Sequence, residues 1–121
     1  MPLAEDNHDN HYHITAYEND SISISHIEYK HSILLTPQNI SDWGVTKIDD
    51  LTPELIARLS EGQPEVVILG TGEKQLFPSP EIYKHFAQLQ IGLEVMANSA
   101  ACRTFNILVA EDRRVTAGFI L

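Results

Sequence analysis

The sequence has little cysteine and little positive charge. Its single cysteine, Cys102, has no partner for an internal disulfide, which suits a reducing compartment and leaves no cysteine-rich metal site. Lys and Arg total 8 against 17 Asp and Glu, so the net charge is −9. Because nucleic-acid affinity comes mostly from Lys and Arg, we expect neither nucleic acid nor an anionic membrane surface as a partner.

The sequence also has no long apolar run. No window approaches the roughly 18 to 20 apolar residues of a membrane-spanning helix, so we expect no membrane insertion. The first residues, MPLAEDNHDNHYH, have neither the basic and apolar regions of a secretory signal nor the Arg-rich composition of a mitochondrial presequence. We therefore expect a cytoplasmic protein. Its 121 residues favour one domain over 12–121, after a polar tail over 1–11 that composition predicts to be disordered.

Strand patterns come first along the chain. From about residue 12 to 36, apolar and polar residues alternate, with turns expected near Asn19-Asp20 and Tyr29-Lys30, and this predicts an antiparallel meander. The segment EVVILG, residues 65–70, has no polar alternation, which is typical of a central strand covered on both faces. Further strands are predicted near 92–96 and 114–121.

Three helices are predicted from capping residues and apolar spacing. Thr52-Pro53 opens one near 52–60, Ser79-Pro80 opens one near 80–89, and Asn98 or Ser99 is expected to cap one near 98–110. The residues expected to face the core are Leu55, Ile56 and Leu59 in the first helix, Ile82, Phe86 and Leu89 in the second, and Ala101, Phe105, Leu108 and Val109 in the third. The fold class is α/β: one domain in which the N-terminal meander packs with a mixed β-sheet flanked by helices.

The order of several segments resembles a known family. VVILGTG and LEVMANSAACRTFNILVAEDRRV, preceded by HSILLTP and Trp43, are similar to the Mth938-like domain family, once catalogued as a domain of unknown function. The resemblance runs from about Tyr12 to Leu121. It implies a compact α/β domain with no established reaction, whose mitochondrial members are associated with assembly of respiratory complex I. The absence of a presequence here suggests a prokaryote-type relative.

The turn Gly70-Thr71-Gly72 raises the question of a phosphate site. Two glycines could expose backbone N–H groups to an anion, but Glu73 follows where a phosphate loop has Lys and then Ser or Thr. We therefore favour a turn that needs positive φ or close packing. The alternative is a ligand cleft made of Gly70, Thr71, Gly72, Glu94, Asn98, Ser99, Cys102 and Arg103.

No complete catalytic site is evident around Cys102. A position near a helix start beside Arg103 could lower the thiol pKa, but Cys102 shares a helical face with Phe105 and Val109, which favours a buried, unreactive thiol. A nucleophilic cysteine needs a base within reach, and His85 is predicted to lie on another helix.

Glu94, the histidines of the N-terminus and Trp43 each have a structural interpretation beside a functional one. Glu94 is read as a solvated strand residue, or one paired with Arg103, in preference to an acid or base. His8, His11 and His13, with Asp6 and Asp9, resemble a metal cluster but have no fixed scaffold, so we expect no metal. Trp43 is either a core side chain, which we favour, or an exposed anchor for a partner.

The sequence therefore favours a non-enzymatic protein-interaction or assembly module, related in role to respiratory complex assembly, with no cofactor and no catalytic residue. Its partner would be a protein of unknown identity, and the oligomeric state is left open. The alternative is a small-ligand-binding protein or enzyme whose cleft lies at the Gly70–Gly72 turn and the start of the helix over Asn98–Arg103.

Overall fold

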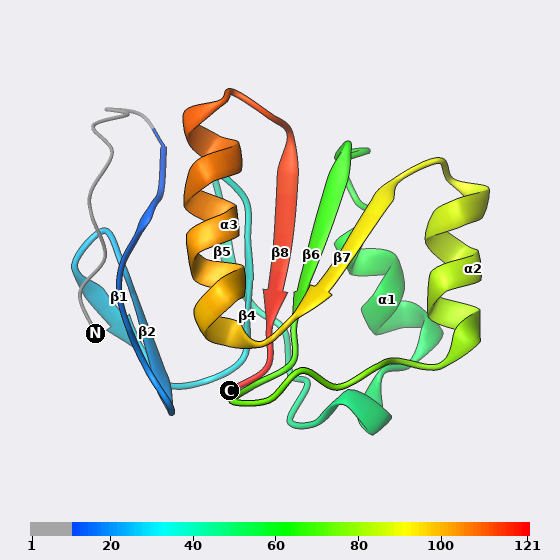
Figure 1. Ribbon diagram of the computed structural model, residues 1–121, viewed down its shortest axis with the longest axis horizontal. Helices are drawn as coiled ribbons and strands as arrows, with labels where there is room; N and C mark the ends of the chain where they lie inside the picture. Colours follow the sequence, from blue (N-terminus) through cyan, green and yellow to red (C-terminus); the bar gives the residue numbers. More distant parts are fainter. Residues whose placement is uncertain (1–10) are drawn as a thin grey trace.

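The computed structural model describes residues 11–121, which form two β-sheets and three α-helices (Figure 1). Apart from His11, the tail predicted to be disordered lies outside the described residues. The predicted α/β class, a meander packed with a mixed sheet and helices, is confirmed.

The N-terminal sheet is antiparallel and has the order β1-β2-β3. Its strands are β1 (Ile14–Glu18), β2 (Ser21–Ile24) and β3 (Ile27–Tyr29). The expected turn at Asn19-Asp20 joins β1 to β2. A second reversal, which the sequence did not predict, is made by Ser25 and His26 with φ values of 47° and 72°. The three strands are therefore shorter and more tightly turned than the alternating pattern implied.

The second sheet has five strands in the order β5-β4-β8-β6-β7. They are β4 (Ile33–Leu35), β5 (Ile40–Asp42), β6 (Val66–Gly70), β7 (Gly92–Met96) and β8 (Val115–Phe119). The expectation that one meander continues to residue 36 is wrong, because β4 leaves the first sheet and pairs antiparallel with β8. A pairing of strands more than 80 residues apart leaves no local signal in the sequence.

Three helices begin close to where the capping residues predicted. They are α1 (Pro53–Leu59), α2 (Pro80–Gln88) and α3 (Asn98–Ala110), and a short 3-10 helix, η1 (Ile48–Asp50), precedes them. The Thr52 hydroxyl accepts a hydrogen bond from the Leu55 N–H, as expected of an N-cap. Leu89 is the error in the predicted core, since it follows the last turn of α2 and is 49% exposed.

The five-stranded sheet is covered on both faces by different elements. One face packs against α3 and the N-terminal sheet, and the other packs against α1, α2 and Trp43, as Figure 1 shows from the placement of the helices. Ile68 of β6 points to the first core, and Val67 and Leu69 point to the second. The prediction of a central strand covered on both faces is confirmed for β6, Val66–Gly70, while Glu65 precedes the strand.

Candidate functional site

The glycine turn closes on itself and on the start of α3. The Thr71 N–H donates to the Met96 carbonyl oxygen at 3.0 Å, and the Gly72 N–H donates to Asn98 Oδ1 at 3.2 Å. The Thr71 hydroxyl donates to the Lys74 carbonyl oxygen at 2.6 Å. Because these N–H groups are already bonded, the turn does not present the open row of donors that a phosphate loop needs.

Each glycine of this turn stands at a position where a β-carbon would be unfavourable. Gly72 has φ of +104°, a conformation that residues with a β-carbon rarely adopt. Gly70 has ordinary φ, but a β-carbon there would overlap Asn98 Oδ1 and lie 3.0 Å from Phe119 Cδ1. The geometry thus favours the interpretation of the turn as one built for positive φ and close packing.

Asn98 is a structural bridge and not the helix cap that the sequence suggested. The N-cap is Ala97, and the Asn98 side chain is fully buried. Its Nδ2 donates to the Ile120 carbonyl oxygen at 2.9 Å while its Oδ1 accepts from Gly72. The capping prediction failed because the side chain bonds to the neighbouring turn and to the segment after β8, where buried backbone groups would otherwise be unsatisfied.

Cys102 lies one turn further along α3 and is fully buried, as the sequence predicted. Burial raises the pKa of its thiol to about 12, and the charge of Arg103 offsets this only in part. His85 lies on α2, which covers the opposite face of the sheet, and its Nε2 is 3.4 Å from Ser60 Oγ. The pairing of Cys102 with a histidine base that nucleophilic chemistry requires is therefore not formed by these two residues.

The remaining residues of the predicted cleft lie around this bridge. Ser99 is half-buried at the start of α3, while Arg103 on α3 and Glu94 on the edge strand β7 are exposed. The structure thus brings together Gly70, Thr71, Gly72 and Asn98 through direct contacts, and it leaves Glu94 at the surface. Ligand binding at these residues stays a prediction.

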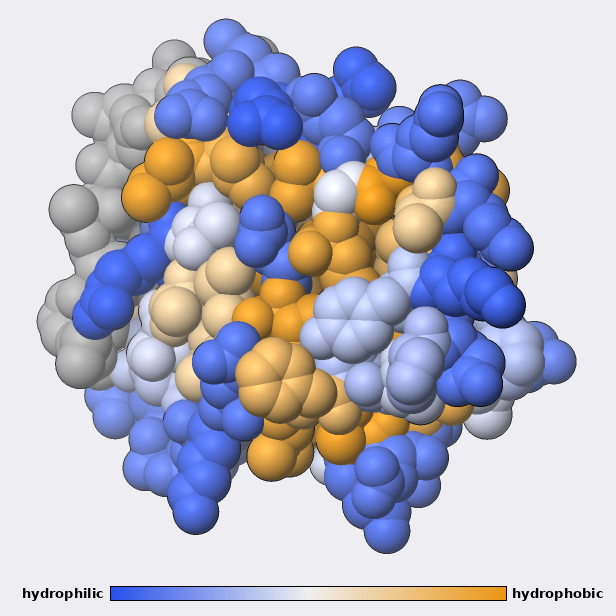
Figure 2. Space-filling view, turned by 45° about the vertical axis from the view of Figure 1, so that its right-hand side comes forward, coloured by the Kyte–Doolittle hydropathy of each residue, from blue (hydrophilic) through white to orange (hydrophobic). Residues whose placement is uncertain are grey.

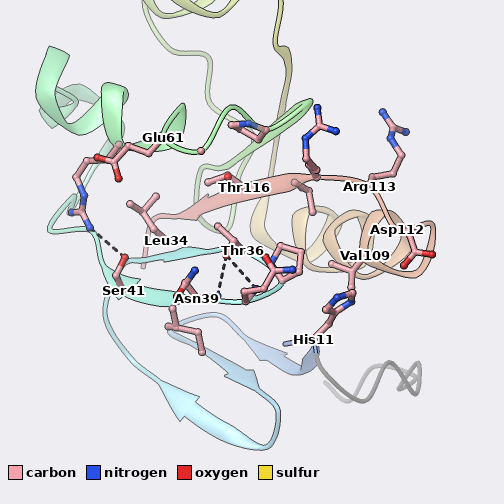
Figure 3. Close-up of a pocket in the computed structure, with 18 residues that line it drawn as sticks. His11, Leu34, Thr36, Asn39, Ser41, Glu61, Val109, Asp112, Arg113 and Thr116 are labelled. Atoms are coloured by element: carbon pink, nitrogen blue, oxygen red, sulfur yellow. Dashed lines mark hydrogen bonds between the residues drawn. The ribbon is translucent and has the colours of Figure 1, made fainter.

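A pocket that the sequence did not predict lies at the other end of the sheet (Figure 3). Its volume is about 690 Å³, within the range of small-molecule sites. The walls come from the turn after β4, the connection from α1 to β6, and the segment from the end of α3 into β8. Because β6 and β8 run parallel, this is the end where both strands begin, away from the glycine turn.

Three of the four arginines of the chain line this pocket: Arg58, Arg113 and Arg114. We call it the arginine pocket. Arg113 Nε lies 3.3 Å from Glu65 Oε1, and the Arg114 N–H donates to the same oxygen at 3.0 Å. That backbone bond, with the nearby guanidinium of Arg113 and the charge of Arg114, lowers the pKa of Glu65. The one signal in the sequence is the adjacent Arg113-Arg114 pair in an otherwise acidic chain.

An apolar surface lies next to the glycine turn. Four of the six large hydrophobic side chains that are exposed among residues 11–121 fall between positions 76 and 89, and Phe77 is 73% exposed. Figure 2 shows hydrophobic side chains at the centre of the face that carries α2 and β7, with hydrophilic ones around them. We use the term apolar surface for Leu76, Phe77 and Tyr83.

Trp43 lies in the core, as the sequence predicted. Trp43 is 1% exposed and its Nε1 donates to the Leu55 carbonyl oxygen at 3.1 Å, so its core role is confirmed. Between residues 11 and 121 no group of three His, Cys, Asp or Glu side chains is arranged to hold a metal ion. His8, Asp6 and Asp9 of the tail lie outside that range.

A family model described as "Protein of unknown function (DUF498/DUF598)" matches residues 14–120. Among solved structures, the chain is similar to a Bordetella pertussis protein described as a Mth938-like domain, with a TM-score of 0.80 and 28% identity, covering 99% of this chain and 92% of that one. The resemblance to the Mth938-like family drawn from the sequence is confirmed.

The relatives of the chain carry two different names. The "13 kDa major membrane protein" of Francisella tularensis subsp. holarctica is 36% identical over 92 residues, which is 74% of each chain. The bovine "NADH dehydrogenase [ubiquinone] 1 alpha subcomplex assembly factor 3" is 33% identical over 88 residues, which is 71% of this chain and 48% of that protein. The chain thus spans about half the length of the assembly factor.

None of the helices between residues 11 and 121 has the length and apolar character needed to cross a bilayer.

Proposed function

The chain belongs to the DUF498/DUF598 family of Mth938-like domains, and on that premise we propose that it acts by binding another protein, as an assembly or accessory module. The observation that carries this proposal is the apolar surface. Exposed aromatic and aliphatic side chains grouped on one face are typical of interaction sites. A relative named as an assembly factor supports the same role for the shared domain.

The partner surface is expected to be neutral or basic. The chain has a net charge of −9, so an acidic partner would be repelled as it approached. Charged residues around an apolar centre affect mainly the rate of association, and they do so less at high salt. We therefore expect association to slow as salt is raised, while the apolar contacts maintain the affinity.

The geometry at the glycine turn favours this role over catalysis by that turn. Its backbone donors are bonded within the fold, the Cys102 thiol is buried, and His85 lies across the sheet. An enzyme that used these groups would first have to open the packed contact between Asn98 and Gly70.

The test compares three baits in an extract of the native host: the natural sequence, Phe77→Ser and Ile107→Ser. Ile107 is 56% exposed on α3, outside the apolar surface, so it is a matched control for loss of an exposed hydrophobic side chain. We expect quantitative mass spectrometry to find a partner that the natural sequence and Ile107→Ser retain and Phe77→Ser loses. Deletion of the gene should lower the abundance of the complex that contains this partner.

One result would contradict the proposal. If the deletion strain accumulated a single metabolite, and the purified protein consumed that metabolite in a reaction abolished by Glu94→Gln or Cys102→Ala, the domain would be an enzyme. The residues at the start of α3 would then be an active site.

A further inference from the structure

Arg58 and Arg114 lie at the arginine pocket, and the charge of Arg114 acts on the nearby Glu65, where it contributes to the lowered pKa of that carboxyl. In the part of the chain from residue 11 to 121, neither guanidinium forms an ion pair with a carboxylate, although the whole chain has 17 Asp and Glu. Arg58 donates from Nη2 to Ser41 Oγ at 3.3 Å, a neutral partner. The pocket thus gathers positive charge in a chain whose net charge is −9.

We propose that the arginine pocket binds a small molecule through an oxyanion group, a carboxylate or a phosphate. The planar guanidinium presents paired N–H donors that match two oxygens of such a group. The pocket volume of about 690 Å³ accommodates a small organic anion and not merely a single ion.

The centre of the pocket is polar and supplies further donors. Figure 3 shows Thr36, Asn39 and Thr116 in the middle, between Glu61 on one side and Asp112 and Arg113 on the other. The Thr36 hydroxyl oxygen accepts from the N–H groups of Gln38 and Asn39, at 3.3 and 2.9 Å. Since both bonds use its oxygen, its own proton is left to donate to a ligand.

Thr116 completes the polar centre. It lies on β8, is 4% exposed and lines the pocket. Because Thr116 lines the pocket, its hydroxyl can donate a hydrogen bond to a ligand oxygen that enters there. Leu34 and Val115 provide apolar contact beside it for the carbon skeleton of the ligand.

The acidic residues of the pocket limit the size and charge of the ligand. Arg113 is held by Glu65 at 3.3 Å and by Glu111 at 4.0 Å, so it contributes little free charge. Glu61 and Asp112 lie on the walls. These carboxylates would repel an extended polyanion, and they leave one confined region where an oxyanion is favoured. The ligand is therefore a small anion and not a nucleic acid.

Binding to the arginine pocket is tested by titrating the isotope-labelled protein with inorganic phosphate and, separately, with citrate. Sodium chloride keeps the ionic strength constant. Backbone amide signals are followed by NMR. We expect saturable shifts at Gln38, Asn39 and Thr116 for at least one probe. Arg58→Gln and Arg114→Gln should each weaken its binding by about tenfold, the loss expected for one charged hydrogen-bonding partner.

Arg103→Gln is the matched control, because Arg103 is the one arginine outside the pocket and the change in net charge is the same. Its affinity for the probe should equal that of the natural sequence. The proposal is overturned if neither probe gives saturable shifts at the pocket amides, or if all three variants weaken binding equally, which would indicate a general effect of charge. Should Arg58→Gln fail to fold, Arg58→Lys replaces it. Lysine keeps the positive charge but lacks the planar pair of donors, so Arg58→Lys is expected to weaken binding less than Arg114→Gln does.

Discussion

Asn98 Oδ1 occupies the space into which a β-carbon on Gly70 would project. The same oxygen accepts the Gly72 N–H, and the amide nitrogen of Asn98 donates to the Ile120 carbonyl oxygen. One buried side chain therefore joins the end of β6, the start of α3 and the segment after β8. Disturbing this contact, or the two cores beside it, should therefore lower the stability of the fold.

Replacing Gly70 with alanine should destabilise the fold. The added methyl group would overlap Asn98 Oδ1, and relieving this overlap in a packed core costs about 1–3 kcal/mol. Gly92→Ala is the control, because a β-carbon there would lie 3.6 Å from the Glu65 carbonyl oxygen, an ordinary contact. Urea unfolding of both variants measures the difference, and equal stabilities would show that the turn adapts without cost.

Removing the side chain of Asn98 should also lower the free energy of unfolding. Asn98→Ala leaves the Gly72 N–H and the Ile120 carbonyl oxygen without their side-chain partner, and each unsatisfied buried group costs about 1–3 kcal/mol. Ser99→Ala, at the next position, should change stability by less than about 0.5 kcal/mol. Thermal unfolding followed by circular dichroism compares the two, and a loss of similar size in both would argue against the bridge.

Gly118 is expected to tolerate no side chain, because the ring of Trp43 covers it. A β-carbon there would lie 2.7 Å from two atoms of the indole ring and 2.9 Å from Leu59 Cδ2. Gly118→Ala should therefore cost about 1–3 kcal/mol by overpacking. Trp43 is the sole tryptophan, so its fluorescence reports the result. We expect a lower urea midpoint and emission shifted to longer wavelength, whereas an unchanged spectrum and midpoint would mean that the ring does not lie on Gly118.

Cys102 should react with thiol reagents only when the fold opens. The side chain is fully buried, and its pKa is raised to about 12, so the reactive thiolate is scarce at neutral pH. At pH 7, labelling of the native protein should be much slower than labelling of an unstructured peptide thiol. Labelling of the protein unfolded in urea is the control for the reactivity of the exposed thiol. Rapid modification of the native protein would contradict the buried thiol and support a nucleophilic role for Cys102.

The same thiol makes stability depend on pH in the alkaline range. The pKa of Cys102 rises from an ordinary value of 9.0 to about 12 in the fold, so the unfolded chain loses this proton first. The contribution of the buried neutral thiol to the free energy of unfolding is complete below pH 9. It is lost as the pH rises from 9 toward 12. The difference in stability between the natural protein and Cys102→Ala should therefore shrink above about pH 9. A difference that stayed constant over that range would contradict the burial of a neutral thiol.

The helices and the central strand could be predicted from the sequence because their signals are local. Thr52-Pro53 and Ser79-Pro80 marked the starts of α1 and α2, and the uninterrupted apolar run marked β6. The spacing of Leu89 continues the face of α2 and so predicts a core position, but the helix ends before it. Periodicity alone does not show where a helix stops.

The features that could not be predicted are contacts between segments that lie far apart in the sequence. The pairing of β4 with β8 and the bonds of Asn98 to Gly72 and Ile120 join positions separated by 22 residues or more. The arginine pocket is assembled from several such segments, so its residues are scattered along the chain. Apart from the adjacent arginines, nothing in the local pattern marks them as neighbours.

The strand order has a consequence for how the protein forms during synthesis. β8 lies between β4 and β6, so the middle of the larger sheet is made by its last strand. The first strand also depends on a late segment, since the Ile14 N–H donates to Asn106 Oδ1 at 2.8 Å and Asn106 Nδ2 donates back to the Ile14 carbonyl oxygen at 2.8 Å. The domain cannot close around its core until residues as far as Phe119 have left the ribosome. A nascent chain stalled before that point would expose the apolar strands β4 and β6 and would be prone to aggregate.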